Sequence, residues 1–216
     1  MIVAFDVDYR YPDGTDAVSG ASVRISPGEI LAILGHNGSG KTTLGKLLSG
    51  ILKPTSGRVE IDGTDTRRMS LGRIGERVGY LFQDPGRQLF TSSVEEEVRF
   101  ALDIQGIAED RIRHRTEHML DTFNLLDLRK SFPFDLSRGE KQRLALAAVM
   151  INEPDFLILD EPTTGLDVRR KSELSRLLIR TGDTGVGMMI ISHDEEFARG
   201  HAHTVMEMDR GVLRRA

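Results

Sequence analysis

The chain has 216 residues, of which 39% are hydrophobic and 29% are charged, and its formal net charge at pH 7 is −4. That length suffices for one large domain, or for a core with an inserted lobe. The mild acidity excludes a general attraction to nucleic acid or to an anionic membrane, and the lack of cysteine excludes disulfides, thiolate chemistry and cysteine-based zinc sites. The sequence shows neither a secretory signal pattern nor a run of about 18 apolar residues, so we expect a soluble, cytoplasmic protein.

The N-terminal part alternates short apolar runs with turns, which indicates strands. The expected strands lie at 2–5, 23–25, 31–34, 57–61 and 78–82. Turns at Pro12-Asp13-Gly14 and Pro27-Gly28 separate the first three strands, and a short amphipathic helix is expected at 43–48.

From about 93 to 152 the apolar residues recur with helical spacing instead. The helices expected there lie at 94–105, 110–125 and 138–151. The elements expected after them are a strand at 156–159, a helix at 168–180, a strand at 186–191, a short helix near 195–199 and a strand pair around 205–212. Strand and helix alternate at both ends, which predicts an α/β protein with a parallel sheet. We expect a single domain, 1–216, with a core of 1–83 and 153–216 and an inserted helical lobe of 84–152.

Residues 35–42 fit the phosphate-loop pattern GxxxxGK[ST] at every fixed position, between a predicted buried strand and a predicted helix. This context lets consecutive backbone N–H groups and a helix N-terminus surround the phosphates of a nucleoside triphosphate. Lys41 is expected to reach the β- and γ-phosphate oxygens, and the Thr42 hydroxyl to bind Mg²⁺. The alternative is a chance Gly/Ser loop before a helix. The expected ATP-binding residues here are Gly35, His36, Asn37, Gly38, Ser39, Gly40, Lys41, Thr42 and Thr43.

The predicted strand 156–159 ends in two carboxylates, Asp160 and Glu161, which is the Walker B pattern. A buried central strand would deliver Asp160 beside the phosphate loop, where its carboxylate can hold Mg²⁺ directly or through water. Glu161 is expected to orient and polarise the water that attacks the γ-phosphate. The alternative is an ordinary strand that ends at an acidic turn.

Six separated patterns occur in the order seen in ATP-binding-cassette (ABC) ATPases, a family that the whole chain resembles. The patterns are Tyr11, the loop at 35–42, Gln83, the segment Leu136-Ser137-Arg138-Gly139-Glu140, the strand that ends in Asp160-Glu161, and Ser192-His193-Asp194. Residues 164–167 also resemble the D-loop of that family. The resemblance implies a P-loop NTPase fold with a mostly parallel central sheet, an N-terminal antiparallel β part and an inserted helical subdomain.

The resemblance also implies roles for three isolated residues. Tyr11 would stack on the adenine ring, although an ordinary turn tyrosine is the alternative. Gln83 would offer its side-chain amide to Mg²⁺ and to the attacking water. His193 would hydrogen-bond the γ-phosphate and hold the geometry with Glu161, whereas a lone histidine at a strand end is more often a polar cap.

The signature segment, 136–140, begins a predicted helix, with Ser137 as the expected N-cap and Glu140 completing a capping box. In ABC ATPases this segment contacts the γ-phosphate bound to a second subunit, which implies that Ser137 and Gly139 contact ATP in trans. Here Arg138 replaces the first glycine of the usual LSGGQ, and Glu140 replaces the glutamine.

Residues 82–90, Phe-Gln-Asp-Pro-Gly-Arg-Gln-Leu-Phe, resemble energy-coupling-factor importers of vitamins and transition-metal ions. In that branch the segment after the glutamine faces a membrane subunit. Exposed Leu89 and Phe90 would suit such docking, whereas the alternative is a solvated acidic linker. The acidic residues 95–97 are equally suited to the first turn of a helix.

The function implied is an ATP-hydrolysing subunit of an ABC-type importer, at the cytoplasmic face of the membrane. The partners implied are a second ATPase subunit (a copy or a paralogue), a transmembrane coupling subunit bound through 83–98 and a separate solute-binding membrane subunit, with no nucleic acid. The alternatives are a conventional ABC importer or exporter ATPase and an ABC-type ATPase that acts on nucleic acid or ribosomes. A non-hydrolysing regulatory module and a small-molecule kinase fit the motifs less well.

Overall fold

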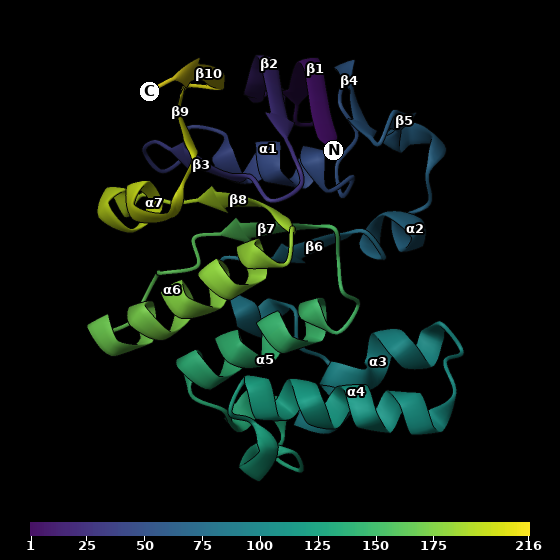
Figure 1. The fold of residues 1–216 in the computed structure, drawn as a ribbon. Helices are drawn as coiled ribbons and strands as arrows, with labels where there is room; N and C mark the ends of the chain where they lie inside the picture. Colours follow the sequence, from purple (N-terminus) through teal and green to yellow (C-terminus); the bar gives the residue numbers. More distant parts are fainter. The chain divides into compact units, whose positions relative to one another are not determined.

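The computed structural model describes residues 1–216, and the chain divides into two units. The core unit comprises Met1–Tyr80 and Asp155–Ala216, and the helical unit comprises Leu81–Pro154. Figure 1 labels the strands and α-helices of both. No helix combines the length and the apolar character that a membrane span requires.

The core unit begins with an antiparallel sheet of order β2-β1-β4-β5. Its strands are β1 (Ile2–Arg10), β2 (Asp16–Ile25), β4 (Ser56–Ile61) and β5 (Thr64–Asp65). Ile2 of β1 pairs with Ile25 on one side and Ile61 on the other, and all three side chains are buried. This sheet therefore has one apolar face, to which Ala4 and, after a register shift, Val7 of β1 also contribute. β2 begins seven residues before the strand expected at 23–25.

A second sheet of order β10-β9-β3-β8-β7-β6 forms the centre of the core unit. Its strands are β3 (Ile30–Leu34), β6 (Val78–Leu81), β7 (Phe156–Asp160), β8 (Gly187–Ile191), β9 (Thr204–Asp209) and β10 (Val212–Arg215). The pairs β3–β8, β3–β9 and β7–β8 are parallel, and β9–β10 is antiparallel. Every residue of β3, β7 and β8 is buried, as expected for parallel strands covered on both faces.

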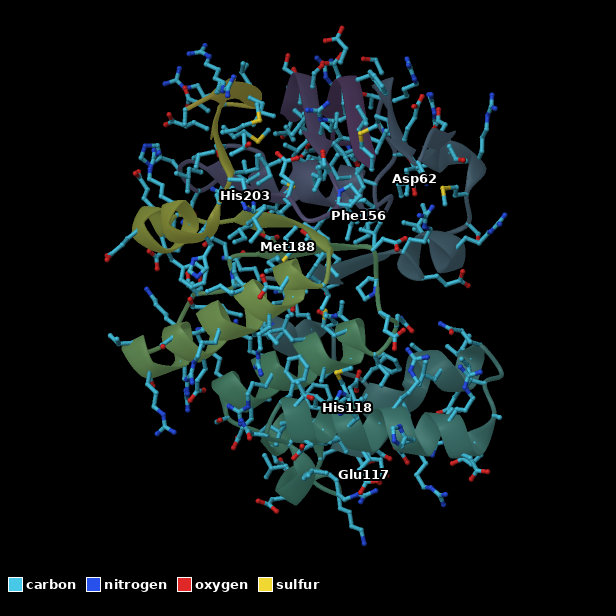
Figure 2. All side chains as sticks on the ribbon, viewed as in Figure 1. Asp62, Glu117, His118, Phe156, Met188 and His203 are labelled. Atoms are coloured by element: carbon cyan, nitrogen blue, oxygen red, sulfur yellow. The ribbon has the colours of Figure 1, made fainter.

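Helix α1 contacts both sheets, β1 and β2 on one side and β7 and β8 on the other. Figure 1 shows α6 on the opposite face of the six-stranded sheet. The helices of the core unit are α1 (Lys41–Leu48), η1 (Thr66–Arg68), α2 (Leu71–Gly75), α6 (Val168–Asp183) and α7 (Glu195–His201). Phe156 and Met188, both labelled in Figure 2, are buried in the core between the sheet and its helices. His203 accepts a hydrogen bond from Ile30 N–H, which joins the start of β9 to β3.

The helical unit holds the three helices predicted for the middle of the chain. Its elements are η2 (Pro85–Arg87), α3 (Val94–Ile104), α4 (Glu109–Thr122), η3 (Leu126–Leu128), η4 (Pro133–Asp135) and α5 (Arg138–Met150). α3 packs against both α4 and α5. α4 ends three residues before the predicted boundary at 125, because Asn124 adopts a left-handed backbone with φ 52° that cannot continue a helix.

Candidate active site

The phosphate loop lies between β3 and α1, where two glycines let the backbone pass close to its neighbours. Gly35 has φ 144°, and a Cβ there would lie 2.2 Å from the Met208 carbonyl oxygen. Gly40 has φ 106° and caps α1, and a Cβ there would lie 2.1 Å from the Ala17 carbonyl oxygen. Any larger residue at either position would therefore displace the loop. The N-terminus of α1, with its free N–H groups, opens at this turn.

Lys41 is the first residue of α1, and its side chain folds back over the loop. Its Nζ donates to the carbonyl oxygens of Gly35 at 2.7 Å and His36 at 2.9 Å. Burial lowers the pKa of Lys41, while the nearby carboxylates of Glu161 and Asp160 act in the opposite direction. The ammonium group thus lies at the mouth of the loop, where phosphate oxygens would be bound.

Asp160, at the end of β7, is 1% exposed and held at both carboxylate oxygens. The Thr42 hydroxyl donates to Oδ1 at 3.0 Å, and the Tyr80 hydroxyl donates to Oδ2 at 3.0 Å. Burial raises the pKa of Asp160, and these two hydrogen bonds partly offset the increase. Carboxylate and hydroxyl oxygens are the protein ligands that Mg²⁺ prefers, so Thr42 and Asp160 fit that ion.

Glu161 follows Asp160 with a left-handed backbone, φ 51°, which is uncommon for a residue with a side chain. Its N–H donates to the Ile191 carbonyl oxygen at 2.8 Å, and this bond fixes the turn against the end of β8. Its carboxylate is 5% exposed, and Oε2 lies 2.7 Å from His193 Nδ1 and 3.3 Å from His193 N. The carboxylate accepts from both nitrogens, so the Nδ1 nitrogen of His193 carries a proton.

A cavity of about 310 Å³ adjoins the phosphate loop. Its lining residues are Leu34, Gly35, His36, Asn37, His193, Glu195, Arg199 and Glu207. The half-exposed His193 ring lies between the buried Glu161 carboxylate and this cavity. Two further hydroxyls are buried without a hydrogen-bond partner, that of Ser39 in the phosphate loop and that of Thr164 in the segment that resembles a D-loop.

Tyr11 follows the end of β1, and its hydroxyl lies 3.0 Å from the Thr43 hydroxyl in the first turn of α1. Its ring packs edge-on against Tyr9, with 4.9 Å between the centroids. The predicted adenine platform is thus hydrogen-bonded to the element that would hold the phosphates.

Other predicted site residues belong to the helical unit. The capping box is confirmed: Ser137 Oγ accepts from Glu140 N–H, and a Glu140 carboxylate oxygen accepts from Ser137 N–H at 2.8 Å. Ser137 is exposed and Gly139 is buried. Their contact with ATP on a second subunit, and the contact of Gln83 with Mg²⁺, stay predictions.

The expectation that Leu89 is exposed is wrong. Its side chain is 3% exposed, whereas Phe90 is 61% exposed and packs edge-on against Phe100, with 4.7 Å between the ring centroids. The solvated acidic linker is also wrong, because α3 begins at Val94 and its acidic first turn has internal partners. Glu97 is buried and accepts hydrogen bonds from the loop before α3.

The acidic residues that flank it are paired as well. Glu95 forms an ion pair with Arg129, and Glu96 accepts from the Ser92 hydroxyl. The acidic run therefore stabilises the helical unit from within.

Tyr80 is a site residue that sequence reasoning missed. A tyrosine in a short apolar strand looks like an ordinary core residue. The sequence signal is the apolar composition of the predicted strand 78–82, because a tyrosine hydroxyl in a buried strand needs a polar partner inside the protein. The carboxylate after β7 is a suitable partner.

The family model described as "ABC transporter" matches residues 18–164 of this chain. The chain belongs to the ABC transporter family. It is 39% identical, over 99% of its own length and 69% of the relative's, to the energy-coupling factor transporter ATP-binding protein EcfA of Methanothermobacter thermautotrophicus. Two relatives from Caldanaerobacter subterraneus and Methanosarcina acetivorans are 40% and 44% identical, but the chain spans only 37% and 33% of their lengths.

Solved structures confirm the predicted fold class, a P-loop NTPase of the ABC ATPase type. CbiO1 of Clostridium perfringens, described as part of the ABC transporter complex CbiONQ, is 37% identical and superposes with a TM-score of 0.87 over 99% of this chain and 88% of that chain. The ATP-binding cassette MJ0796, solved as a dimer bound to ADP and Pi, has a TM-score of 0.90, 100% coverage of this chain and 98% of that chain. At 24% identity that likeness shows the fold alone. The chain is thus an ABC ATPase domain.

Proposed function

We propose that this chain hydrolyses ATP as the motor subunit of an ABC-type membrane importer of the energy-coupling-factor type, for a vitamin or a transition-metal ion. The observation that carries the ATPase assignment is the meeting of Thr42, Asp160 and Glu161 at one edge of the six-stranded sheet. The similarity to EcfA and CbiO1 supports the energy-coupling-factor type.

In the proposed reaction the chain's residues bind and orient ATP and move one proton. Lys41 leaves the loop carbonyls to contact the β- and γ-phosphate oxygens, and Thr42 with Asp160 would hold Mg²⁺. Mg²⁺, when bound, neutralises charge on the β- and γ-phosphates. Glu161 accepts a proton from the water that attacks the γ-phosphate, and His193 keeps that carboxylate in place.

The proposed site is completed by a second ATPase subunit, a copy or a paralogue, whose Ser137 and Gly139 face the γ-phosphate. Ser137 suits this role because it caps α5 and is exposed, so its hydroxyl and the nearby helix N-terminus are accessible to an anion. We infer that ATP closes such a dimer and that hydrolysis reopens it at the cytoplasmic face of the membrane.

We place the contact with the transmembrane coupling subunit on an exposed apolar patch of the helical unit, formed by Phe90, Phe100 and Ile104. These side chains are 61%, 40% and 71% exposed. Phe100 and Ile104 lie four residues apart on α3 and so share one face of the helix, and the Phe90 ring packs against Phe100. Contiguous exposed apolar side chains of this kind mark protein interaction sites.

The variant Glu161→Gln tests the ATPase assignment. We expect it to bind ATP with unchanged affinity, to hydrolyse ATP at least about 100-fold more slowly, and to accumulate an ATP-bound dimer in size-exclusion chromatography. Glu76→Gln, at an exposed position after α2, is the matched control and should retain full turnover. Full turnover by Glu161→Gln would remove Glu161 from its proposed role.

Co-purification with a coupling subunit of the energy-coupling-factor type tests the membrane partner. Phe90→Asp and Ile104→Asp should abolish the complex, while Phe134→Asp should preserve it. Phe134 is a suitable control because it is also an exposed aromatic residue of the helical unit, 48% exposed, but it belongs to η4 and its ring packs against Phe132. Complex formation that survives both patch variants would refute docking at this patch.

A further inference from the structure

Tyr80 is placed to act on the proposed Mg²⁺ site through Asp160. Its hydroxyl oxygen lies 3.0 Å from Asp160 Oδ2, and its side chain is almost fully buried on β6. A carboxylate can only accept, so the phenol is the donor in this bond. The other carboxylate oxygen accepts from Thr42 at 3.0 Å. Two donors from separate elements, β6 and α1, thus hold the Asp160 carboxylate in one orientation.

The buried tyrosine ring lies close to α1 at Gly45. A Cβ at Gly45 would lie 3.4 Å from Tyr80 Cε2 and 2.7 Å from Ile191 Cδ1. Burial of the ring beside α1 restricts its rotamer. A rigid ring gives its hydroxyl a fixed position, and the hydroxyl transmits that position to Asp160.

We propose that Tyr80 is a positioning residue for Mg²⁺: its hydroxyl holds the Asp160 carboxylate, together with Thr42, in the orientation that the ion requires. The proposal rests on the proposed function, in which Thr42 and Asp160 hold the ion. In this role Tyr80 acts through Asp160 and not through a contact of its own with ATP or the metal. Groups that orient a metal-binding carboxylate in this way typically change metal affinity 10- to 100-fold when they are removed.

The test is the affinity of Tyr80→Phe for Mn²⁺, a spectroscopic substitute for Mg²⁺, measured by electron paramagnetic resonance in the presence of ADP. We expect an affinity at least about tenfold weaker than that of the wild-type protein. The affinity for ADP in EDTA should stay within about twofold, because phenylalanine retains the ring and the phosphate loop is unchanged. A purely structural role of Tyr80 would change both affinities together.

Tyr9→Phe is the matched control, because it also removes one phenol hydroxyl from the core unit. The Tyr9 ring packs against Tyr11, and its hydroxyl is not among the groups that hold Asp160. It should bind Mn²⁺ as the wild-type protein does. Wild-type Mn²⁺ affinity in Tyr80→Phe, or an equal loss of ADP affinity in EDTA, would overturn the proposal.

The variant Asp160→Asn separates this proposal from the proposed function. If Asp160→Asn loses Mn²⁺ affinity and Tyr80→Phe does not, only the role of Tyr80 is wrong. If Asp160→Asn binds Mn²⁺ with wild-type affinity, the assignment of Asp160 to the metal site is wrong, and the role of Tyr80 fails with it.

Discussion

Glu97 holds the loop that carries Phe90. The stability lost when Glu97 is replaced by glutamine can be estimated from the hydrogen bonds of its carboxylate. The buried Glu97 carboxylate accepts three hydrogen bonds at Oε2, from Phe90 N–H at 2.9 Å, from Thr91 N–H at 2.9 Å and from Thr91 Oγ1 at 2.8 Å. Hydrogen bonds to a charged group contribute about 1.5–3 kcal/mol each, against about 0.5–1.5 kcal/mol for neutral pairs. Glutamine retains an oxygen acceptor, so Glu97→Gln should cost roughly 1 kcal/mol per bond and about 3 kcal/mol in all.

Thermal unfolding monitored by circular dichroism measures this cost. For a chain of this size 1 kcal/mol corresponds to about 2–4 °C in Tm, so we expect a decrease of about 6–12 °C. Glu96→Gln is the matched control on the same turn of α3, because Glu96 is exposed and accepts from Ser92. A surface change of this kind should alter stability by less than about 0.5 kcal/mol. Equal Tm shifts in the two variants, or a wild-type Tm for Glu97→Gln, would refute the reasoning.

Three further predictions concern other parts of the chain. Gly40→Ala should weaken ATP binding at least about tenfold, because the new Cβ would lie 2.1 Å from the Ala17 carbonyl oxygen, and neither atom can move away without moving the backbone. Wild-type ATP affinity in a titration would contradict this prediction. Glu140→Gln should strengthen the ATP-dependent dimer, because glutamine keeps an oxygen acceptor for the helix cap and removes a negative charge from the proposed γ-phosphate contact. Analytical ultracentrifugation measures the dimer, and a weaker dimer would count against that contact. The Lys171 ammonium lowers the pKa of Asp194, so this pair stabilises the folded chain above about pH 4, and its contribution is lost as the pH falls through the folded-state pKa of Asp194. In urea unfolding, the stability of Lys171→Met should therefore fall less than that of the wild-type protein between about pH 6 and about pH 3.

Short-range patterns in the sequence predicted most of the local structure. The phosphate loop, the run 156–161 and the capping box at Ser137 each occupy a few consecutive residues, so chain connectivity alone keeps their groups together. The fold class also followed from the sequence, because the alternation of strand and helix at both ends leaves few arrangements that bury every apolar face. The boundaries were less accurate: α2 was not predicted, and β2 begins at Asp16 instead of Val23.

The tertiary structure decided which distant groups meet and which side chains are buried. Tyr80 and Asp160 lie 80 positions apart in sequence and meet only because β6 and β7 belong to one sheet, so no local pattern could pair them. Exposure was equally undetermined, since Leu89 and Phe90 are adjacent apolar residues and only the packing around them buries the first and exposes the second. A hydrophobic side chain favours burial, but which hydrophobic side chains are buried depends on how the elements pack. The sequence by itself therefore determined the ATP-binding elements and the fold class, and the packing of those elements determined what holds the Asp160 carboxylate in place.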